Sequence, residues 1–217
     1  MEHHNTLISN TINFVKQTLS GAEAGHDWFH AERVWKNTRA IAQKESCHVL
    51  VAELAALLHD IADAKFHNGD EEKGPAMARK FLTDQNAEEE IIEQVVNIIR
   101  NISFAGGNTA KEVHSLELAV VQDADRLDAL GAIGIARTFH YGGHRNRLLY
   151  DPEIKPNMHM DKETYRNSTA PTINHFYEKL LLLKDRMNTE TGKKMAKERH
   201  DYMIGFLEQF YKEWEGK

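Results

Sequence analysis

The sequence contains little cysteine, few prolines and no long apolar run. Cys47 is the single cysteine in 217 residues, so no internal disulfide can form, and a disulfide-stapled secreted scaffold is excluded. The longest apolar runs, Leu54 to Leu58 and Leu180 to Leu183, are far shorter than the roughly 20 residues that a membrane helix needs. We therefore expect a soluble globular protein without a membrane partner.

The sequence also lacks an excess of basic residues. The 33 Asp and Glu outnumber the 27 Lys and Arg, which gives a formal net charge of −6. Nucleic-acid affinity depends on a broad basic footprint, so we expect no nucleic-acid partner, while a local basic pocket for a small anion remains compatible. Residues 1–6 lack the charged-then-apolar pattern of a signal peptide. Together with the unpaired Cys47, this favours a cytoplasmic location.

Apolar residues recur at spacings of three and four along most of the chain, which predicts an all-α fold. The predicted helices run through Leu19 and then over 27–45, 49–61, 75–82, 88–101, about 109–121, 125–139, 173–183 and 191–214. Asn86 and Glu89 have the spacing of a capping box, which would start the helix over 88–101. The small residues of 125–139 would permit close approach of another backbone.

We expect one structural domain with three parts. Residues 1–139 form a helical core that carries the candidate site. Residues 140–171 contain three of the four prolines and little periodicity, which is typical of a functional lid or pocket segment. Residues 172–217 form C-terminal helices that pack on the core.

Three separated segments place His or Asp at the ends of apolar helices. These residues are His26, Asp27 and His30, then the doublet His59-Asp60, then Asp123 and Asp125. Ionisable groups at such positions cost several kcal/mol each unless they are paired or bind a metal. Imidazole nitrogens with carboxylate oxygens suit Mn²⁺, Fe²⁺, Co²⁺ or Zn²⁺ and leave positions for water and substrate. The residues alone also allow ordinary histidines that are satisfied by hydrogen bonds.

The same segments resemble the motifs of the HD-domain metal-dependent phosphohydrolases. Residues 25–34 are similar to the opening motif, residues 57–63 contain the His-Asp doublet, and residues 123–128 are similar to the closing motif. The resemblance covers nearly the whole chain and implies an HD-type helical bundle. The metal ligands that it implies are His30, His59, Asp60 and Asp125.

The resemblance also bears on the metal and on the branch of the family. Dinuclear members carry further histidines where this chain has Arg100 to Ser103, so a single divalent ion is expected. Mn²⁺ is favoured, with Mg²⁺, Co²⁺, Fe²⁺ and Zn²⁺ as alternatives. Residues 176–189 and the tail to Trp214 resemble a bacterial branch that is similar to nucleoside triphosphate pyrophosphohydrolases.

Residues around the implied metal are predicted to act on the substrate. Asp63 lies one helical turn after the doublet and matches an acidic position near the attacked phosphate, where it would orient water or move its proton. Arg33 and Lys65 would neutralise phosphate oxygens. His26 and Asp27 are predicted either to contact substrate or to support the metal ligands, and Lys184 is predicted to form part of a triphosphate clamp.

The leading hypothesis is a hydrolase that uses a metal-activated water to split (deoxy)nucleoside triphosphates into monophosphate and pyrophosphate. One alternative is a nucleoside 5′-monophosphatase or a phosphodiesterase on a signalling nucleotide. Another is a nucleotide-sensing module without turnover. The sequence does not decide the base, the sugar, the physiological metal or whether the protein is a homodimer.

Overall fold

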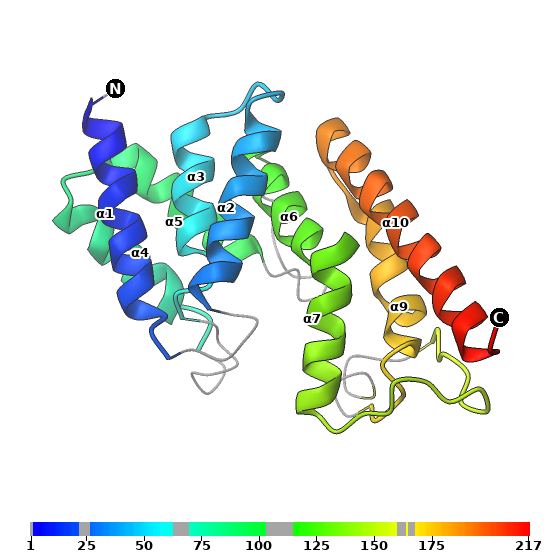
Figure 1. Ribbon diagram of the computed structural model, residues 1–217. Coiled ribbons are helices and arrows are strands. Elements are labelled where there is room, and N and C mark those ends of the chain that lie inside the picture. Colours follow the sequence, from blue (N-terminus) through cyan, green and yellow to red (C-terminus); the bar gives the residue numbers. More distant parts are fainter. Residues whose placement is uncertain (1, 22–26, 63–69, 103–114, 160–163, 165–167) are drawn as a thin grey trace. The chain divides into compact units, whose positions relative to one another are not determined.

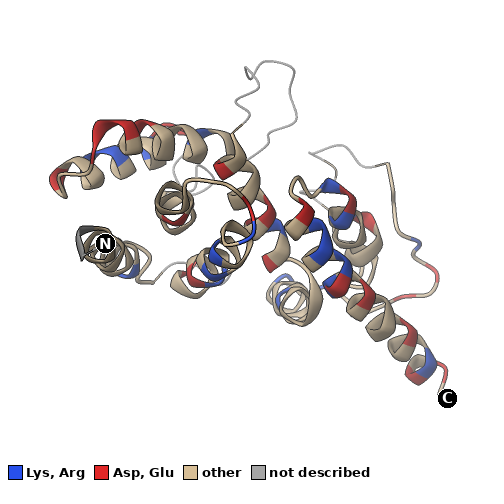
Figure 2. Ribbon diagram, turned by 90° about the horizontal axis from the view of Figure 1, so that it is seen from above, with Lys and Arg blue, Asp and Glu red and all other residues tan. Residues whose placement is uncertain are grey.

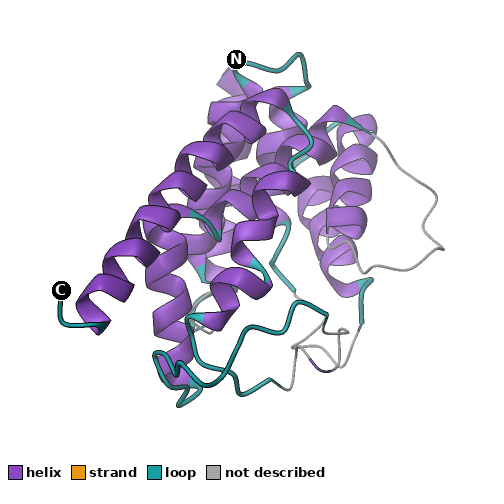
Figure 3. Ribbon diagram, turned by 90° about the vertical axis from the view of Figure 1, so that its right-hand side faces the viewer, coloured by secondary structure: helices purple, strands orange, loops and turns teal. Residues whose placement is uncertain are grey.

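The computed structural model describes residues 2–21, 27–62, 70–102, 115–159, 164 and 168–217. Within these ranges the chain forms helices joined by loops and no strand, which confirms the predicted all-α fold (Figure 3). The elements are α1 (Glu2–Thr18), α2 (Trp28–Ala42), α3 (Val49–Leu58), α4 (Lys73–Asp84), α5 (Glu89–Ile102), α6 (Leu116–Asp128), α7 (Gly131–His144), α9 (Asn174–Glu178), the 3-10 helix η2 (Leu180–Arg186) and α10 (Glu190–Trp214).

Contacts within the chain divide it into two units, Met1–Asp125 and Arg126–Lys217. The boundary falls within α6, whose last three residues belong to the second unit. The predicted division at residues 139 and 171 stays a prediction. Among the described helices, none combines the length and the apolarity that crossing a membrane requires.

Helix α3 is the centre of the first unit. It contacts α1, α2 and α5, and it lies between α1 and α2 in Figure 1. Leu54, Leu57 and Leu58 are fully buried because α3 carries Leu and Ala on all of its sides. Burying a leucine side chain stabilises the fold by about 2 kcal/mol, so this short helix contributes much of the hydrophobic stabilisation of the unit. The helix ends at Leu58, and His59 is the next residue.

Two helix starts in the first unit use side-chain caps. Asp27 accepts a hydrogen bond from the amide of His30 at 2.9 Å and starts α2. His48 accepts one from the amide of Val51 at 3.3 Å and starts α3. Such caps satisfy amide groups that have no partner inside the helix, and each contributes about 1 kcal/mol.

The predicted capping box at Asn86 is wrong. Asn86 has a φ of +55°, and its amide donates to the carbonyl of Thr83 at 3.0 Å, so it ends α4. Helix α5 begins three residues later, at Glu89. Asparagine tolerates the left-handed conformation better than most residues, and a helix often ends there.

The predicted helix over 125–139 is divided in the structure. Helix α6 runs to Asp128 and α7 starts at Gly131, whose φ of +70° turns the chain between them. A Cβ at Gly134 would overlap the carbonyl oxygen of Ala129, so the expected close backbone approach occurs within this turn. Helix α7 continues to His144, five residues into the segment predicted to be irregular.

The second unit has an aromatic core. The rings of Phe139 and Phe206 each lie 5.9 Å from that of Phe176, which is fully buried. The predicted helix over 173–183 is instead the short α9 followed by η2. Before α9, the amides of Thr172 and Ile173 donate to the carbonyls of Leu148 and Leu149 at 2.8 and 3.0 Å. These bonds join the two ends of the chain segment between α7 and α9 to each other.

Charges of both signs alternate along the outer side of α10, as Figure 2 shows. Lys193 pairs with Glu190 at 2.6 Å and Lys197 with Asp201 at 2.5 Å. Exposed pairs at this spacing contribute only a few tenths of a kcal/mol each. They keep the outer face of α10 polar, while buried Met203 and Leu207 attach the helix to its unit.

Acid should destabilise the protein through His175 on α9. Burial, together with the positive charges of Lys179 and Arg147, lowers the pKa of His175 from the ordinary 6.5 to about 4. The neutral imidazole is favoured in the folded state, so this stabilising contribution is complete above pH 6.5 and is lost as the pH falls towards 4. The loss amounts to at most about 3 kcal/mol.

Urea unfolding at pH 7.5 and pH 4.5 measures this contribution. We expect His175→Gln to reduce the fall in unfolding free energy between these two conditions, while His159→Gln, at an exposed histidine, leaves it unchanged. An equal fall in wild type and His175→Gln would contradict the assignment.

Candidate metal centre

The candidate metal centre consists of four side chains from three elements of the first unit. His30 lies in the first turn of α2, His59 and Asp60 directly follow α3, and Asp125 lies near the end of α6. The ligand atoms of His30, His59 and Asp60 all lie within 4.8 Å of one another. The structure therefore brings together residues that are up to 30 positions apart in the chain.

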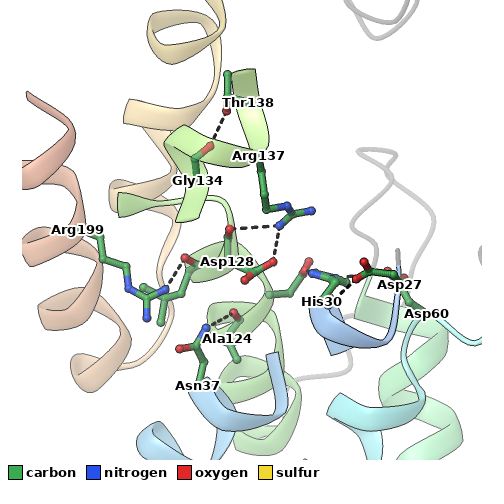
Figure 4. A network of polar contacts seen from close by, with 12 residues as sticks. Asp27, His30, Asn37, Asp60, Ala124, Asp128, Gly134, Arg137, Thr138 and Arg199 are labelled. Carbon is green, nitrogen blue, oxygen red and sulfur yellow. Dashed lines mark hydrogen bonds and ion pairs between the residues drawn. The ribbon is translucent and has the colours of Figure 1, made fainter. Parts of the chain in front are cut away.

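The carboxylate of Asp60 is shared by the two imidazoles. Its Oδ2 lies 3.4 Å from Nε2 of His30 and 3.5 Å from Nε2 of His59. The centroids of the two imidazole rings are 5.3 Å apart and the ring planes are inclined at 65°, so the rings do not stack on each other. Figure 4 shows His30 and Asp60. Asp125 approaches from α6, with its Oδ1 3.5 Å from Nε2 of His30.

His59 is held in the tautomer that a metal ligand requires. Its Nδ1 lies 2.8 Å from the carbonyl oxygen of Ala56, and because a carbonyl only accepts, Nδ1 carries the proton. The other ring nitrogen, Nε2, is buried and has no hydrogen-bond partner among the described residues. A buried nitrogen lone pair without a donor is costly, and a cation at this position would satisfy it.

His30 is positioned by its own helix cap. The Asp27 carboxylate holds the His30 amide at 2.9 Å, and the side chain of His30 is 3% exposed. Asp27 was predicted to contact substrate or support the site, and the structure shows it at the start of α2 with this backbone bond (Figure 4). An aspartate immediately before a helix is the sequence signal for such a cap.

His30, His59 and Asp60 have the spacing of ligands to one divalent cation, and together with Asp125 they have a charge that suits one. Two ligands at about 2.1 Å from one ion lie about 3.0 Å apart at right angles and about 3.4 Å apart in a tetrahedron. The separations of 3.4 to 3.5 Å are close to these values. Two carboxylates with two neutral imidazoles carry two negative charges, which a divalent ion neutralises.

The other predicted site residues fall into two groups. His26, Asp63 and Lys65 lie outside the described residues, so their roles stay predictions. Arg33 is half-buried on α2, one turn after His30. Lys184 belongs to the second unit, where its ammonium group lies 3.7 Å from Asp185.

One contact of the centre could not be predicted from residue types. The partner of His59 Nδ1 is a backbone carbonyl, that of Ala56, and any residue at position 56 would supply it. Only the helical path of α3 indicates it, because a side chain just after a helix can turn back to the carbonyl three residues earlier.

Comparison with known proteins identifies the family. The HD domain model matches residues 28–130, which include all four side chains of the centre. The chain is 37% identical over 211 residues to the uncharacterized protein YpgQ of Bacillus subtilis, covering 94% of this chain and 91% of that protein. The chain belongs to the HD-domain family.

Solved structures of HD-domain proteins share the whole fold. An HD-superfamily hydrolase from Bacillus thuringiensis has 45% sequence identity and a TM-score of 0.81, with coverage of 99% of this chain and 100% of that chain. B. subtilis YpgQ, solved in complex with ADP, superposes with a TM-score of 0.77 over 97% of this chain and 96% of its own, at 32% identity in that alignment. These relatives support an HD-superfamily hydrolase, a class that binds divalent metal.

Proposed function

We propose that this HD-domain protein hydrolyses nucleotides at the candidate metal centre, and that it cleaves (deoxy)nucleoside triphosphates to monophosphate and pyrophosphate. The observation that carries the proposal is the cluster of His30, His59 and Asp60, with the unsatisfied Nε2 of His59 facing Asp60. The similarity to YpgQ, which was solved with ADP, supports a nucleotide as the substrate class. The triphosphate specificity rests on the resemblance of residues 176–189 to the pyrophosphohydrolase branch.

One divalent ion would be held by His30, His59, Asp60 and Asp125. When bound, such an ion lowers the pKa of a coordinated water and polarises a phosphoryl oxygen. Two imidazoles and two carboxylates form a mixed nitrogen and oxygen donor set, which suits Mn²⁺ and leaves Mg²⁺, Co²⁺, Fe²⁺ and Zn²⁺ as alternatives.

The side chains of the protein would do three things in this proposal. The bonds from Ala56 and Asp27 fix the two histidines before substrate arrives, so no reorganisation is needed at the reacting centre. Arg33 would bind phosphate oxygens, since it follows His30 by one helical turn and a guanidinium group binds two oxygens at once. Asp63 would orient the attacking water and accept its proton, with Lys65 on the phosphate.

The products of hydrolysis test the proposal. Purified protein with Mn²⁺ is incubated with nucleoside tri-, di- and monophosphates, and pyrophosphate and phosphate are measured separately. We expect pyrophosphate from triphosphates, with no turnover by His59→Asn. Phosphate released from monophosphates would favour the nucleotidase alternative. Tight nucleotide binding without any product, with each of the candidate metals, would contradict catalysis and favour a sensing module.

A further inference from the structure

Helix α2 contacts α6 through a second polar side chain besides His30. The Nδ2 atom of Asn37 donates a hydrogen bond to the carbonyl oxygen of Ala124 at 3.3 Å (Figure 4). Asn37 follows His30 by seven residues, which is two helical turns or about 10 Å along α2, and it lies on the same face. The orientation of its amide is certain here, because a carbonyl oxygen can only accept.

The Asn37 bond is attached to the backbone of a predicted ligand. The carbonyl of Ala124 belongs to the peptide group whose nitrogen is that of Asp125. Ala124 lies inside α6, where a carbonyl normally accepts a hydrogen bond from the amide four residues later. The backbone hydrogen bonds of α6 therefore do not depend on Asn37. The bond therefore adds an attachment between two helices.

Asp125 needs such an attachment more than the other ligands do. Its side chain is 43% exposed, against 3% for His30 and His59 and 16% for Asp60. It also stands outside the group whose ligand atoms lie within 4.8 Å of one another. Side-chain packing therefore constrains Asp125 least, and its distance from His30 depends on where α6 lies against α2.

We propose that Asn37 is a positioning residue that sets the approach of Asp125 to the metal. His30 contacts Asp125 of α6 in the first turn of α2, and Asn37 contacts Ala124 of α6 two turns later. The two contacts together restrict both the rotation of α6 and its translation along α2. Without the bond, α6 would be free to shift by fractions of an ångström, and the weakly packed carboxylate of Asp125 would move with it. The inference rests on the proposed metal centre.

The test compares three variants of the full-length protein. Asn37→Leu removes the donor and keeps a similar volume, and Asn37→Gln keeps an amide donor. Lys36→Ala alters the neighbouring exposed residue, which pairs with Glu32 at 3.1 Å. Titration calorimetry measures the Kd for Mn²⁺, calorimetric melting gives the metal-free Tm, and steady-state kinetics separates kcat from KM.

We expect Asn37→Leu to raise the Kd for Mn²⁺ by about tenfold or more, as removal of outer partners of metal sites does. Its metal-free Tm should stay within about 4 °C of wild type, as for the loss of one modest hydrogen bond. Asn37→Gln should recover most of the affinity, and Lys36→Ala should match wild type. The kinetic loss should appear in kcat more than in KM.

An unchanged Kd for Mn²⁺ in Asn37→Leu overturns the positioning role while the metal centre stands. Equal losses in Asn37→Leu and Asn37→Gln that parallel a fall in metal-free Tm also overturn it, because they show a role in stability alone. A wild-type protein that binds no Mn²⁺ overturns the metal centre itself, and this inference with it.

Discussion

Replacing Asp60 with alanine is expected to abolish Mn²⁺ binding and to lower kcat by more than about a hundredfold, since loss of a ligand exceeds the 10- to 100-fold effect of losing an outer partner. The reason is geometric: Asp60 Oδ2 lies 3.4 Å from Nε2 of His30 and 3.5 Å from Nε2 of His59. Without it, the carboxylate oxygen beside both imidazoles is lost, and Asp125 remains beside His30. Titration calorimetry with Mn²⁺ and the pyrophosphate assay measure both effects.

Asp84→Asn is the matched control for this variant. Asp84 is an exposed aspartate of the same unit, and its recorded partner is Lys80 at 2.7 Å. The control should keep wild-type affinity and turnover. In wild type, Mn²⁺ at about one hundred times its Kd should stabilise the fold by about 2.7 kcal/mol, and Asp60→Ala should lose this metal-dependent increase in Tm. Full activity of Asp60→Ala would remove the proposed mechanism.

Replacing Asp128 with asparagine is expected to lower the free energy of unfolding by about 3 kcal/mol. The side chain of Asp128 is 2% exposed, and the guanidinium group of Arg137 donates to both its carboxylate and its backbone carbonyl (Figure 4). Arg199 donates to the carbonyl of Leu127, the preceding residue. Arg137 thus provides a partner for the Asp128 carbonyl at the C-terminus of α6, and Arg199 adds a second donor to the Leu127 carbonyl, which also accepts from the amide of Leu130 at 3.1 Å.

The Asp128 prediction is tested by urea unfolding together with a double-mutant cycle. Arg137→Met should destabilise the protein as Asp128→Asn does, and the double variant should lose less than the sum of the two. Asp201→Asn is the control, because exposed Asp201 pairs with Lys197 on the surface of α10. Losses below about 0.5 kcal/mol for Asp128→Asn would show that the buried pair contributes little.

Periodicity was sufficient to predict the fold class, but it was poor at locating helix ends. The spacing of apolar residues over 49–61 predicted a helix, and the structure forms α3 there with its Leu and Ala residues buried. The predicted helix ends were wrong at positions where the backbone conformation of one residue ends a helix. Gly131 was interpreted as one of several small packing residues, whereas its φ of +70° separates α6 from α7. Asn86 matched a capping box in spacing, yet it adopts the left-handed conformation that ends the previous helix.

The residues His30, His59 and Asp60, which the structure brings together, were easier to predict than their surroundings. Side-chain type reveals a potential ligand such as His59, while its partner, the Ala56 carbonyl, depends only on the path of the chain. Asp27 could have been a substrate contact or a support for the site by sequence, and only the described geometry shows its bond to the His30 amide. The bond from Asn37 to Ala124 joins residues 87 positions apart and has no local sequence signal.

Anomalous diffraction from crystals soaked in Mn²⁺ tests the central claim most directly. The account predicts one manganese peak at about 2.1 to 2.3 Å from Nε2 of His30, Nε2 of His59 and a carboxylate oxygen of each of Asp60 and Asp125. A fully occupied manganese peak elsewhere, or these four groups beyond bonding distance with no peak between them, would contradict it.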